Sequence, residues 1–274
     1  MPLYGKAAAV LLVVAVALLL LRTLVGSLEP RFVFFPTKGE DETPARFGLR
    51  YQAVTLTTAD GERLSAWQLE PEQPRAAVVY FHGNGGNLSL WLPVFAALHM
   101  QGVRVLAVDY RGYGLSTGTP TEDGVYRDAE AAVRHAAAHR TPGLPLVFWG
   151  RSLGAPIAAF AARVVTPDAV VLESGFPDKA SVARSQPVLR ALNLFGRYRF
   201  STVELLRDFP RPVLVMHGDA DSIVPFALGE ELFERIDAHK EFVRISGADH
   251  NDFFSVNHTA YWTPVLAFLD RLTR

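Results

Sequence analysis

The pattern of apolar positions begins with one uninterrupted block. Every residue from Ala7 to Leu21 is Ala, Val or Leu, and apolar residues recur past Arg22 as far as Leu28. A helix needs about 20 apolar residues to span a bilayer, so we expect residues 1–28 to form a membrane anchor. A signal peptide has the same charged start and apolar centre, but the only candidate cleavage site, Val25-Gly26-Ser27, is a weak one. Positive residues flank the block on both sides, so the pattern does not assign the side of the membrane.

The polar and apolar positions that follow predict a linker and then the first strands of a sheet. Residues 29–50 carry proline, glycine and charges of both signs, and we expect them to form the linker. Two alternating stretches, 51–57 and 64–69, flank an Asp-Gly turn at 59–62 and predict a β-hairpin. The stretch 76–81 is apolar throughout, as expected of a parallel strand that is buried on both faces.

Strand and helix patterns alternate along the rest of the chain, with one interruption. We expect strands at 103–108, 145–149, 169–172, 212–216 and 242–245. We expect helices at about 122–139, directly after Ser152, near 226–236 and at 259–272. The alternation is typical of an α/β fold with a mostly parallel, doubly wound sheet. The sequence therefore predicts one domain at 51–274, with a short cap insertion at about 176–210.

Composition excludes several classes of function. The chain has 274 residues, is 49% hydrophobic and carries a formal net charge of −1. Binding to nucleic acid needs a surplus of Lys and Arg, so no nucleic-acid partner is expected. The chain has no cysteine, which excludes disulfides, thiolate zinc sites and a cysteine nucleophile.

The most informative stretch is Gly150-Arg151-Ser152-Leu153-Gly154, which lies between a strand pattern and an alanine-rich helical pattern. A G-x-S-x-G sequence in this context is the signature of a nucleophile elbow. The turn holds its serine in a strained backbone conformation with the hydroxyl pointing outward, and the flanking glycines avoid a clash. Ser152 is therefore the predicted nucleophile. The alternative is a serine at an ordinary strand-to-helix junction.

A serine hydroxyl is a poor nucleophile unless a base accepts its proton and a carboxylate orients that base. Asp219 and Asp221 follow the strand expected at 212–216, and His250 follows the next expected strand. Catalytic groups in open α/β sheets gather at these carboxyl ends. The order Ser152, Asp221, His250 is the order of the triad in the fold that carries this elbow. Asp219 remains the alternative acid.

Five motifs together give the chain a resemblance to a known family. They are FHGNGGN at 81–87, DYRGYGLSTGTP at 109–120, GRSLG at 150–154, HGDADSIVP at 217–225 and GADHND at 247–252. With these motifs, residues 30–272 resemble the α/β-hydrolases, and within them the small membrane-anchored acyl hydrolases of the bud-emergence-like and α/β-hydrolase-domain group. The resemblance implies an α/β-hydrolase fold.

The resemblance also implies roles for individual residues. It gives the role of the acid to Asp221 and leaves Asp219 as part of the loop. It implies an oxyanion hole formed by the backbone N–H of Leu153 and by Asn84. It implies that His82, before that loop, has a structural role. No cofactor is implied, and no metal is expected because H-E-x-x-H or a comparable ligand spacing does not occur.

We therefore expect a membrane-anchored serine hydrolase that cleaves carboxylic esters or thioesters through an acyl-enzyme. The expected partners are a small-molecule acyl substrate, including lipids, and the membrane itself. Two alternatives stay open. One is a serine peptidase or amidase of the same fold, and the other is a non-catalytic binding module at the membrane.

The cap insertion has a composition of its own. Basic residues outnumber acidic ones in a chain that is otherwise slightly acidic: Lys179, Arg184, Arg190, Arg197, Arg199, Arg207 and Arg211 stand against Asp178, Glu204 and Asp208. Leucines and aromatic residues interleave with these cations. This composition favours a lid over Ser152 that faces a membrane or an anionic substrate. The alternative is an ordinary cap helix packed on the sheet.

Overall fold

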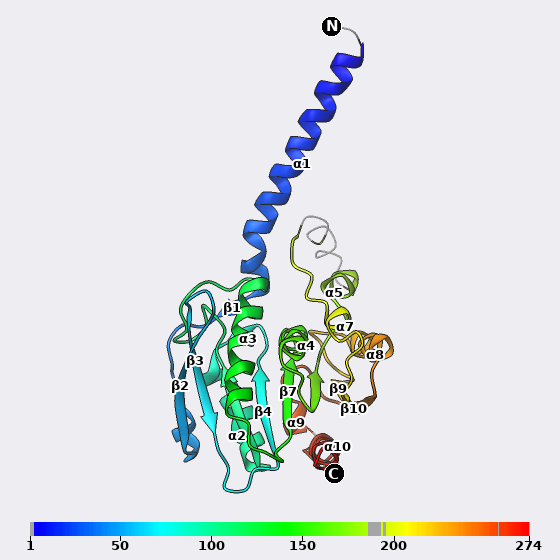
Figure 1. The fold of residues 1–274 in the computed structure, drawn as a ribbon. Coiled ribbons are helices and arrows are strands. Elements are labelled where there is room, and N and C mark those ends of the chain that lie inside the picture. Colours follow the sequence, from blue (N-terminus) through cyan, green and yellow to red (C-terminus); the bar gives the residue numbers. More distant parts are fainter. Residues whose placement is uncertain (1–2, 186–192, 194–195, 257, 274) are drawn as a thin grey trace.

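The computed structural model describes residues 3–185, 193, 196–256 and 258–273. Its centre is an eight-stranded sheet with the order β10-β9-β8-β7-β4-β6-β3-β2 (Figure 1). The strands are β2 (Tyr51–Thr57), β3 (Arg63–Leu69), β4 (Ala76–Phe81), β6 (Val103–Val108), β7 (Leu146–Arg151), β8 (Ala169–Glu173), β9 (Val213–Gly218) and β10 (Lys240–Ile245). β2 and β3 form an antiparallel hairpin, β3 is antiparallel to β6, and the remaining pairs are parallel. The predicted hairpin and the mostly parallel sheet are confirmed.

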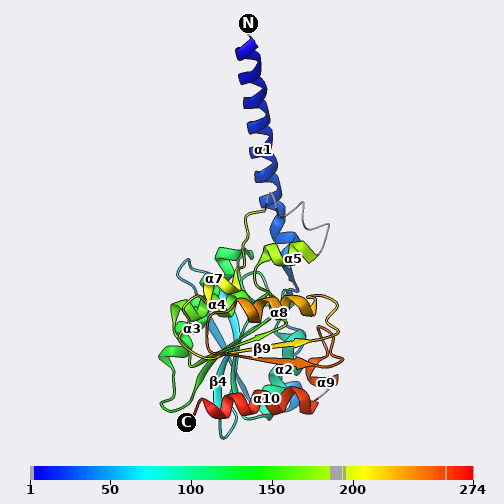
Figure 2. The same ribbon diagram turned by 90° about the vertical axis from the view of Figure 1, so that its right-hand side faces the viewer.

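Helices cover both faces of the sheet, and each layer has its own hydrophobic core (Figure 2). One face packs against α3 (Glu122–Ala138), α4 (Gly154–Val164) and α8 (Phe226–Arg235). The other face packs against α2 (Leu88–Met100) and α10 (His258–Arg271). Short helices η1 (Pro44–Phe47) and α9 (Phe253–Val256) lie in connections between these elements. Alternate residues of each central strand enter opposite cores, as the continuous apolar patterns require.

Helix α2 was not among the predicted elements. Its sequence, LSLWLPVFAALHM, is apolar nearly all round and carries Pro93, so it shows no helical periodicity. The signal at its start is Asn87, whose side chain accepts hydrogen bonds from the N–H groups of Ser89 and Leu90. An Asn in this position satisfies backbone donors that the helix leaves unpaired.

Helix α1 (Leu3–Val33) projects from the body of the protein (Figures 1 and 2). Its part from Val10 to Val33 is long and apolar enough to cross a membrane, a property that signal sequences share. The helix continues beyond residue 28, where the linker was expected to begin. Pro30 has no N–H to donate to the carbonyl four residues earlier, yet the helix continues through it to Val33, and the neighbouring Glu29 is held by the body of the protein.

The cap insertion contains α5 (Lys179–Ser185) and α7 (Thr202–Leu205), and α5 lies near the base of α1 in both views. Residues 186–192, 194 and 195, including Arg190, lie outside the described residues. Glu122 of α3 accepts hydrogen bonds from the N–H groups of Arg199 and Phe200, at 2.7 and 2.6 Å. The Arg199 side chain is exposed and that of Phe200 is buried. The described part of the insertion is thus fixed to the domain by its backbone.

Candidate active site

Ser152 lies at the turn between β7 and α4. Its φ of 54° is in the left-handed region, which is strained for a residue with a side chain. The Ser152 N–H donates to the carbonyl of Glu173 at 2.8 Å, and the Ser152 carbonyl accepts from Ala155 at 2.9 Å. These bonds hold the backbone in the strained conformation. The geometry is that of the elbow that the sequence pattern predicted.

Both flanking glycines are required by close backbone contacts. A Cβ on Gly150 would collide with the backbone of Gly154 across the turn. A Cβ on Gly154 would collide with the carbonyl of Phe81 at the end of β4. The second glycine therefore lets α4 approach the neighbouring strand, a constraint that is not visible in the pentapeptide itself.

Asp221 and His250 come from loops after β9 and β10 and are in contact. The Nδ1 of His250 lies 2.8 Å from Oδ2 and 3.0 Å from Oδ1 of Asp221, and both residues are buried. A carboxylate only accepts hydrogen bonds, so Nδ1 carries the proton and Nε2 is left as a proton acceptor. Burial raises the pKa of Asp221, but hydrogen bonds from His217 and His250 outweigh it and hold this pKa well below its ordinary value. Asp221 is therefore charged at neutral pH.

Asp219 lies in the same loop as Asp221 and has different partners. It pairs with Arg244 at 2.9 Å and accepts the N–H of Gly247 at 2.7 Å. These hydrogen bonds lower its pKa below the ordinary value. Asp219 makes no contact with His250 among the hydrogen bonds of the described residues, so the geometry favours Asp221 as the partner of the histidine.

Two backbone N–H groups at the site make no hydrogen bond within the part of the chain that the structure describes. They belong to Asn84, in the loop after β4, and to Leu153, directly after Ser152. The Asn84 side chain is occupied, since its Nδ2 donates to the carbonyl of Val33 at 3.2 Å. Two unoccupied N–H groups of this kind, next to a serine hydroxyl, could stabilise a tetrahedral oxyanion.

The carbonyl groups of the loop after β4 are held in place. The Nδ1 of His82 lies 2.7 Å from the carbonyl oxygen of Gly83 and donates to it. Tyr110 and Tyr113 donate their hydroxyls to the carbonyls of His82 and Asn84 at 2.8 and 2.7 Å. The N–H of a trans peptide points opposite to its carbonyl, so fixing the Gly83 carbonyl also aims the N–H of Asn84.

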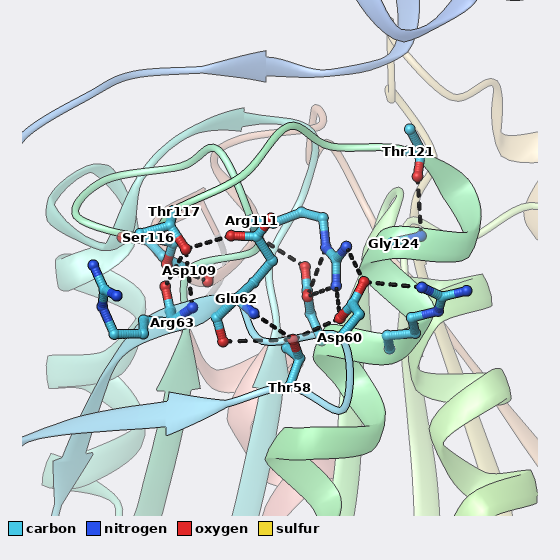
Figure 3. A network of polar contacts seen from close by, with 12 residues as sticks. Thr58, Asp60, Glu62, Arg63, Asp109, Arg111, Ser116, Thr117, Thr121 and Gly124 are labelled. Carbon is cyan, nitrogen blue, oxygen red and sulfur yellow. Dashed lines mark hydrogen bonds and ion pairs between the residues drawn. The ribbon is translucent and has the colours of Figure 1, made fainter.

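The loop that carries these tyrosines is itself fixed by a polar network around Arg111 (Figure 3). The Arg111 guanidinium pairs with Asp60, from the β2–β3 turn, at 2.9 Å and with Asp128, from α3, at 2.8 Å. Hydrogen bonds from Arg111 are the largest cause that lowers the pKa of Asp60. The Arg111 N–H also donates to Asp128 at 2.8 Å. A bidentate, largely buried arginine thus ties the β2–β3 turn and α3 to the loop under the site.

Sequence reasoning missed a buried ion pair next to Ser152. Arg151 and Glu173 are both fully enclosed, with Nη1 of Arg151 3.5 Å from Oε1 of Glu173. Arg151 Nη2 donates to the backbone carbonyl of His250, and Glu173 accepts from Trp149 at 2.9 Å. The pair links β7 and β8 to the loop that carries His250. A charged residue at the x position before the serine was the only signal in the sequence.

A cavity of about 280 Å³ lies against Ser152. Its lining is mainly apolar and comes from the cap, the loop after β4, the turn at Ser152, the loop that carries Asp221 and helix α1: Val25, Leu28, Glu29, Phe32, Val33, Asn84, Ser152, Leu153, Phe176, Lys179, Val182, Ala183, Asn193, Phe200, Ile223 and Val224. The sequence analysis did not place any residue of the anchor at the site. Among the described residues, no cluster of three His, Asp or Glu side chains could hold a metal ion.

The sequence of this chain is similar to a known family and to several known proteins. The model of a family described as "Serine aminopeptidase, S33" matches residues 72–199. An uncharacterized protein of Mycobacterium tuberculosis is 32% identical over 233 residues, which cover 84% of this chain and 83% of that protein. The alpha/beta hydrolase domain-containing protein WAV2 of Arabidopsis thaliana is 28% identical, covering 90% and 89% of the two chains. An uncharacterized membrane protein of Saccharomyces cerevisiae is also 28% identical, covering 83% and 82%.

Solved structures show the same architecture. The esterase Pf2001 of Pyrococcus furiosus superposes with a TM-score of 0.71 over 87% of this chain and 97% of its own, with 21% sequence identity. At that identity the likeness concerns the fold.

Proposed function

The chain belongs to the α/β-hydrolase superfamily, and from that premise we propose that it is a membrane-anchored serine hydrolase that cleaves acyl esters or thioesters. The observation that carries the proposal is that three features lie at the same edge of the sheet, in the turns and loops that follow its parallel strands. These are the strained Ser152, the His250–Asp221 pair, and the unoccupied N–H groups of Asn84 and Leu153. Together they supply a nucleophile, a base with its orienting acid, and an oxyanion hole.

The proposed reaction proceeds through an acyl-enzyme. Ser152 Oγ attacks the carbonyl carbon of the substrate while Nε2 of His250 takes the hydroxyl proton. The N–H groups of Asn84 and Leu153 stabilise the oxyanion of the tetrahedral intermediate. The intermediate collapses, and His250 returns the proton to the departing alcohol or thiol. A water molecule, deprotonated by His250, then hydrolyses the acyl-enzyme and releases the acid.

The lining of the cavity favours an acyl group over the N-terminus of a peptide. An aminopeptidase needs an unpaired anion to receive the substrate ammonium group. The one carboxylate among the described lining residues is Glu29, and it is already paired with Lys179 at 2.5 Å. The remaining surface is mainly apolar, which suits a hydrocarbon chain.

An activity screen tests this choice. We expect the purified full chain to hydrolyse fluorogenic acyl esters, with little turnover of the matching aminoacyl amides, because the cavity offers no free anion to an ammonium group. The screen compares kcat/KM for the two substrate classes carrying the same fluorophore. Preferential cleavage of the aminoacyl amides would instead support the peptidase alternative.

Membrane anchoring is tested by fractionation. We expect the full chain to remain in the membrane fraction after washes with high salt and with alkaline carbonate, and to be released by detergent. Arginine at Val13 and Val16 should weaken retention, because each cation at the centre of a spanning helix costs about 2.5–3.5 kcal/mol. Thr23→Arg is the matched control, since a cation near the helix end reaches the interface. Recovery of a mature chain that begins near Leu28 would indicate a cleaved signal peptide.

A further inference from the structure

We propose that the last turns of α1 form a wall of the acyl pocket, and that the acyl chain of a membrane lipid reaches Ser152 along this helix from the bilayer. This inference rests on the proposed function and extends it. It makes the substrate a long-chain fatty acyl ester that resides in the membrane. It also makes the anchor a part of the substrate site as well as a tether.

The residues of α1 that line the cavity lie on one side of the helix. Val25, Leu28 and Phe32 follow one another at spacings of three and four residues, which places them on a single face. The stretch from Val25 to Val33 rises by about 12 Å, at 1.5 Å per residue. The wall therefore extends from the oxyanion loop, which Val33 contacts through its carbonyl, toward the membrane-spanning part of the helix.

The apolar wall is continuous with the apolar surface of the anchor. Leu24, directly before the first lining residue, is 56% exposed, and Leu20, one turn further, is 64% exposed. In a bilayer these side chains would contact lipid chains. An acyl chain that follows the row Leu20, Leu24 and Leu28 would thus stay in contact with apolar side chains of α1 from the lipid to the pocket, which reduces the exposure of its methylenes to water.

A buried ionic contact holds this wall in place. Glu29 is 8% exposed, pairs with Lys179 of α5 at 2.5 Å, and accepts hydrogen bonds from the N–H groups of Arg197 and Tyr198 at 2.6 and 3.2 Å. A carboxylate on an otherwise apolar helix is costly to bury unless it is paired and hydrogen-bonded. A helix that only anchored the domain would not need a buried carboxylate at this position. Here the carboxylate fixes the helix against the cap.

The anchor is also joined to the catalytic machinery. Val33 accepts a hydrogen bond from the Asn84 side chain at 3.2 Å, and the N–H of Phe35 donates to the Asn84 carbonyl at 2.9 Å. The strands β1 (Phe35–Pro36) and β5 (Gly85–Gly86) then pair in parallel. The end of α1 and the loop of the oxyanion hole therefore form one unit.

The size of the cavity agrees with a single chain. At about 280 Å³ it lies near the lower end of the range for small-molecule pockets. A lipid with two chains would not fit as a whole. One acyl chain would enter, and the remainder of the lipid would stay in the bilayer.

The test measures chain-length selectivity of the full chain in phosphatidylcholine vesicles. The substrates are a palmitoyl ester dissolved in the bilayer and a water-soluble butyryl ester of the same fluorophore. We expect Leu28→Trp to lower the ratio of palmitoyl to butyryl turnover by about tenfold or more, because a misplaced bulky group excludes a substrate by about that factor. The matched control Leu19→Trp introduces the same side chain at an exposed position on the opposite side of the same helix and should leave the ratio unchanged. Val25 lies further along α1 from the oxyanion loop than Leu28. Val25→Trp should therefore still allow turnover of medium-length acyl chains that Leu28→Trp excludes.

The outcomes separate this inference from the proposed function. If the wild-type protein cleaves neither ester, the proposed function fails. If the butyryl ester is cleaved in a Ser152-dependent manner but both tryptophan variants of the pocket wall keep the wild-type ratio, the inference fails while the proposed function stands.

If those variants do not accumulate, a cross-linking experiment replaces them. The Ser152→Ala protein is irradiated in vesicles that contain a lipid with a photoreactive acyl chain. Cross-links to residues 25–33 and Phe176 support the pocket route, and cross-links confined to residues before Leu24 overturn it.

Discussion

Replacing Ser152 with alanine is expected to lower kcat for acyl ester hydrolysis by about four to six orders of magnitude, because the acyl-enzyme can no longer form. The same variant should lose all labelling by a fluorophosphonate probe, which reacts with an activated serine hydroxyl. The substitution removes one oxygen atom from a residue that makes its structural hydrogen bonds through the backbone, to Glu173 and Ala155. The fold should therefore be retained, and circular dichroism and thermal unfolding check this.

The neighbouring Ser174 provides a control for the labelling experiment. It is fully buried and, like Ser152, has a positive φ, here 48°. No base lies against it among the hydrogen bonds of the described residues, so Ser174→Ala should leave probe labelling intact. Labelling that persists in Ser152→Ala and disappears in Ser174→Ala would show that the nucleophile is Ser174, after β8, and would contradict the assignment to Ser152. Absence of labelling in the wild-type protein would favour a non-catalytic binding module.

The sheet could be predicted from the sequence because its central parallel strands are buried on both faces. Such strands are mostly or entirely apolar, and the patterns at 76–81 and 103–108 match the observed strands residue for residue. Helix α2 could not be predicted in the same way. It is apolar on all sides, so its sequence lacks the periodic contrast that identifies a helix at a surface.

The candidate site was predictable only in part, for a different reason. Ser152, Asp221 and His250 each lie in the turn or loop that follows a strand, and that position is visible in the sequence. The contacts that orient them are formed between residues far apart in the chain. Glu29 pairs with Lys179 across 150 positions, and no local pattern connects an acid near the end of an anchor with a lysine in a cap. The role of Arg151 could not be predicted for the same reason, since its partner Glu173 lies on the neighbouring strand.

The choice between two carboxylates in one loop leads to the second large expected effect. Asp221→Asn should lower kcat by about 10³–10⁴-fold with little change in KM, as expected when an orienting acid is replaced by its amide. Asp219→Asn should change kcat by less than about tenfold, because Asp219 is bonded to Arg244 and to the N–H of Gly247, and no hydrogen bond among the described residues joins it to His250. Both substitutions preserve side-chain shape, so each is the control for the other.

The physical reason lies in the direction of hydrogen bonds at Asp221. Its Oδ1 accepts the N–H groups of Ile223 and Val224 at 3.0 and 2.8 Å, while Oδ2 faces Nδ1 of His250 at 2.8 Å. An asparagine would keep its oxygen on the two backbone donors and turn its NH₂ group toward His250, since the reverse would set donors against donors. Nδ1 would then have to accept, the proton would move to Nε2, and the imidazole could no longer take the proton of Ser152. A greater loss of kcat in Asp219→Asn than in Asp221→Asn would transfer the role of the acid to Asp219.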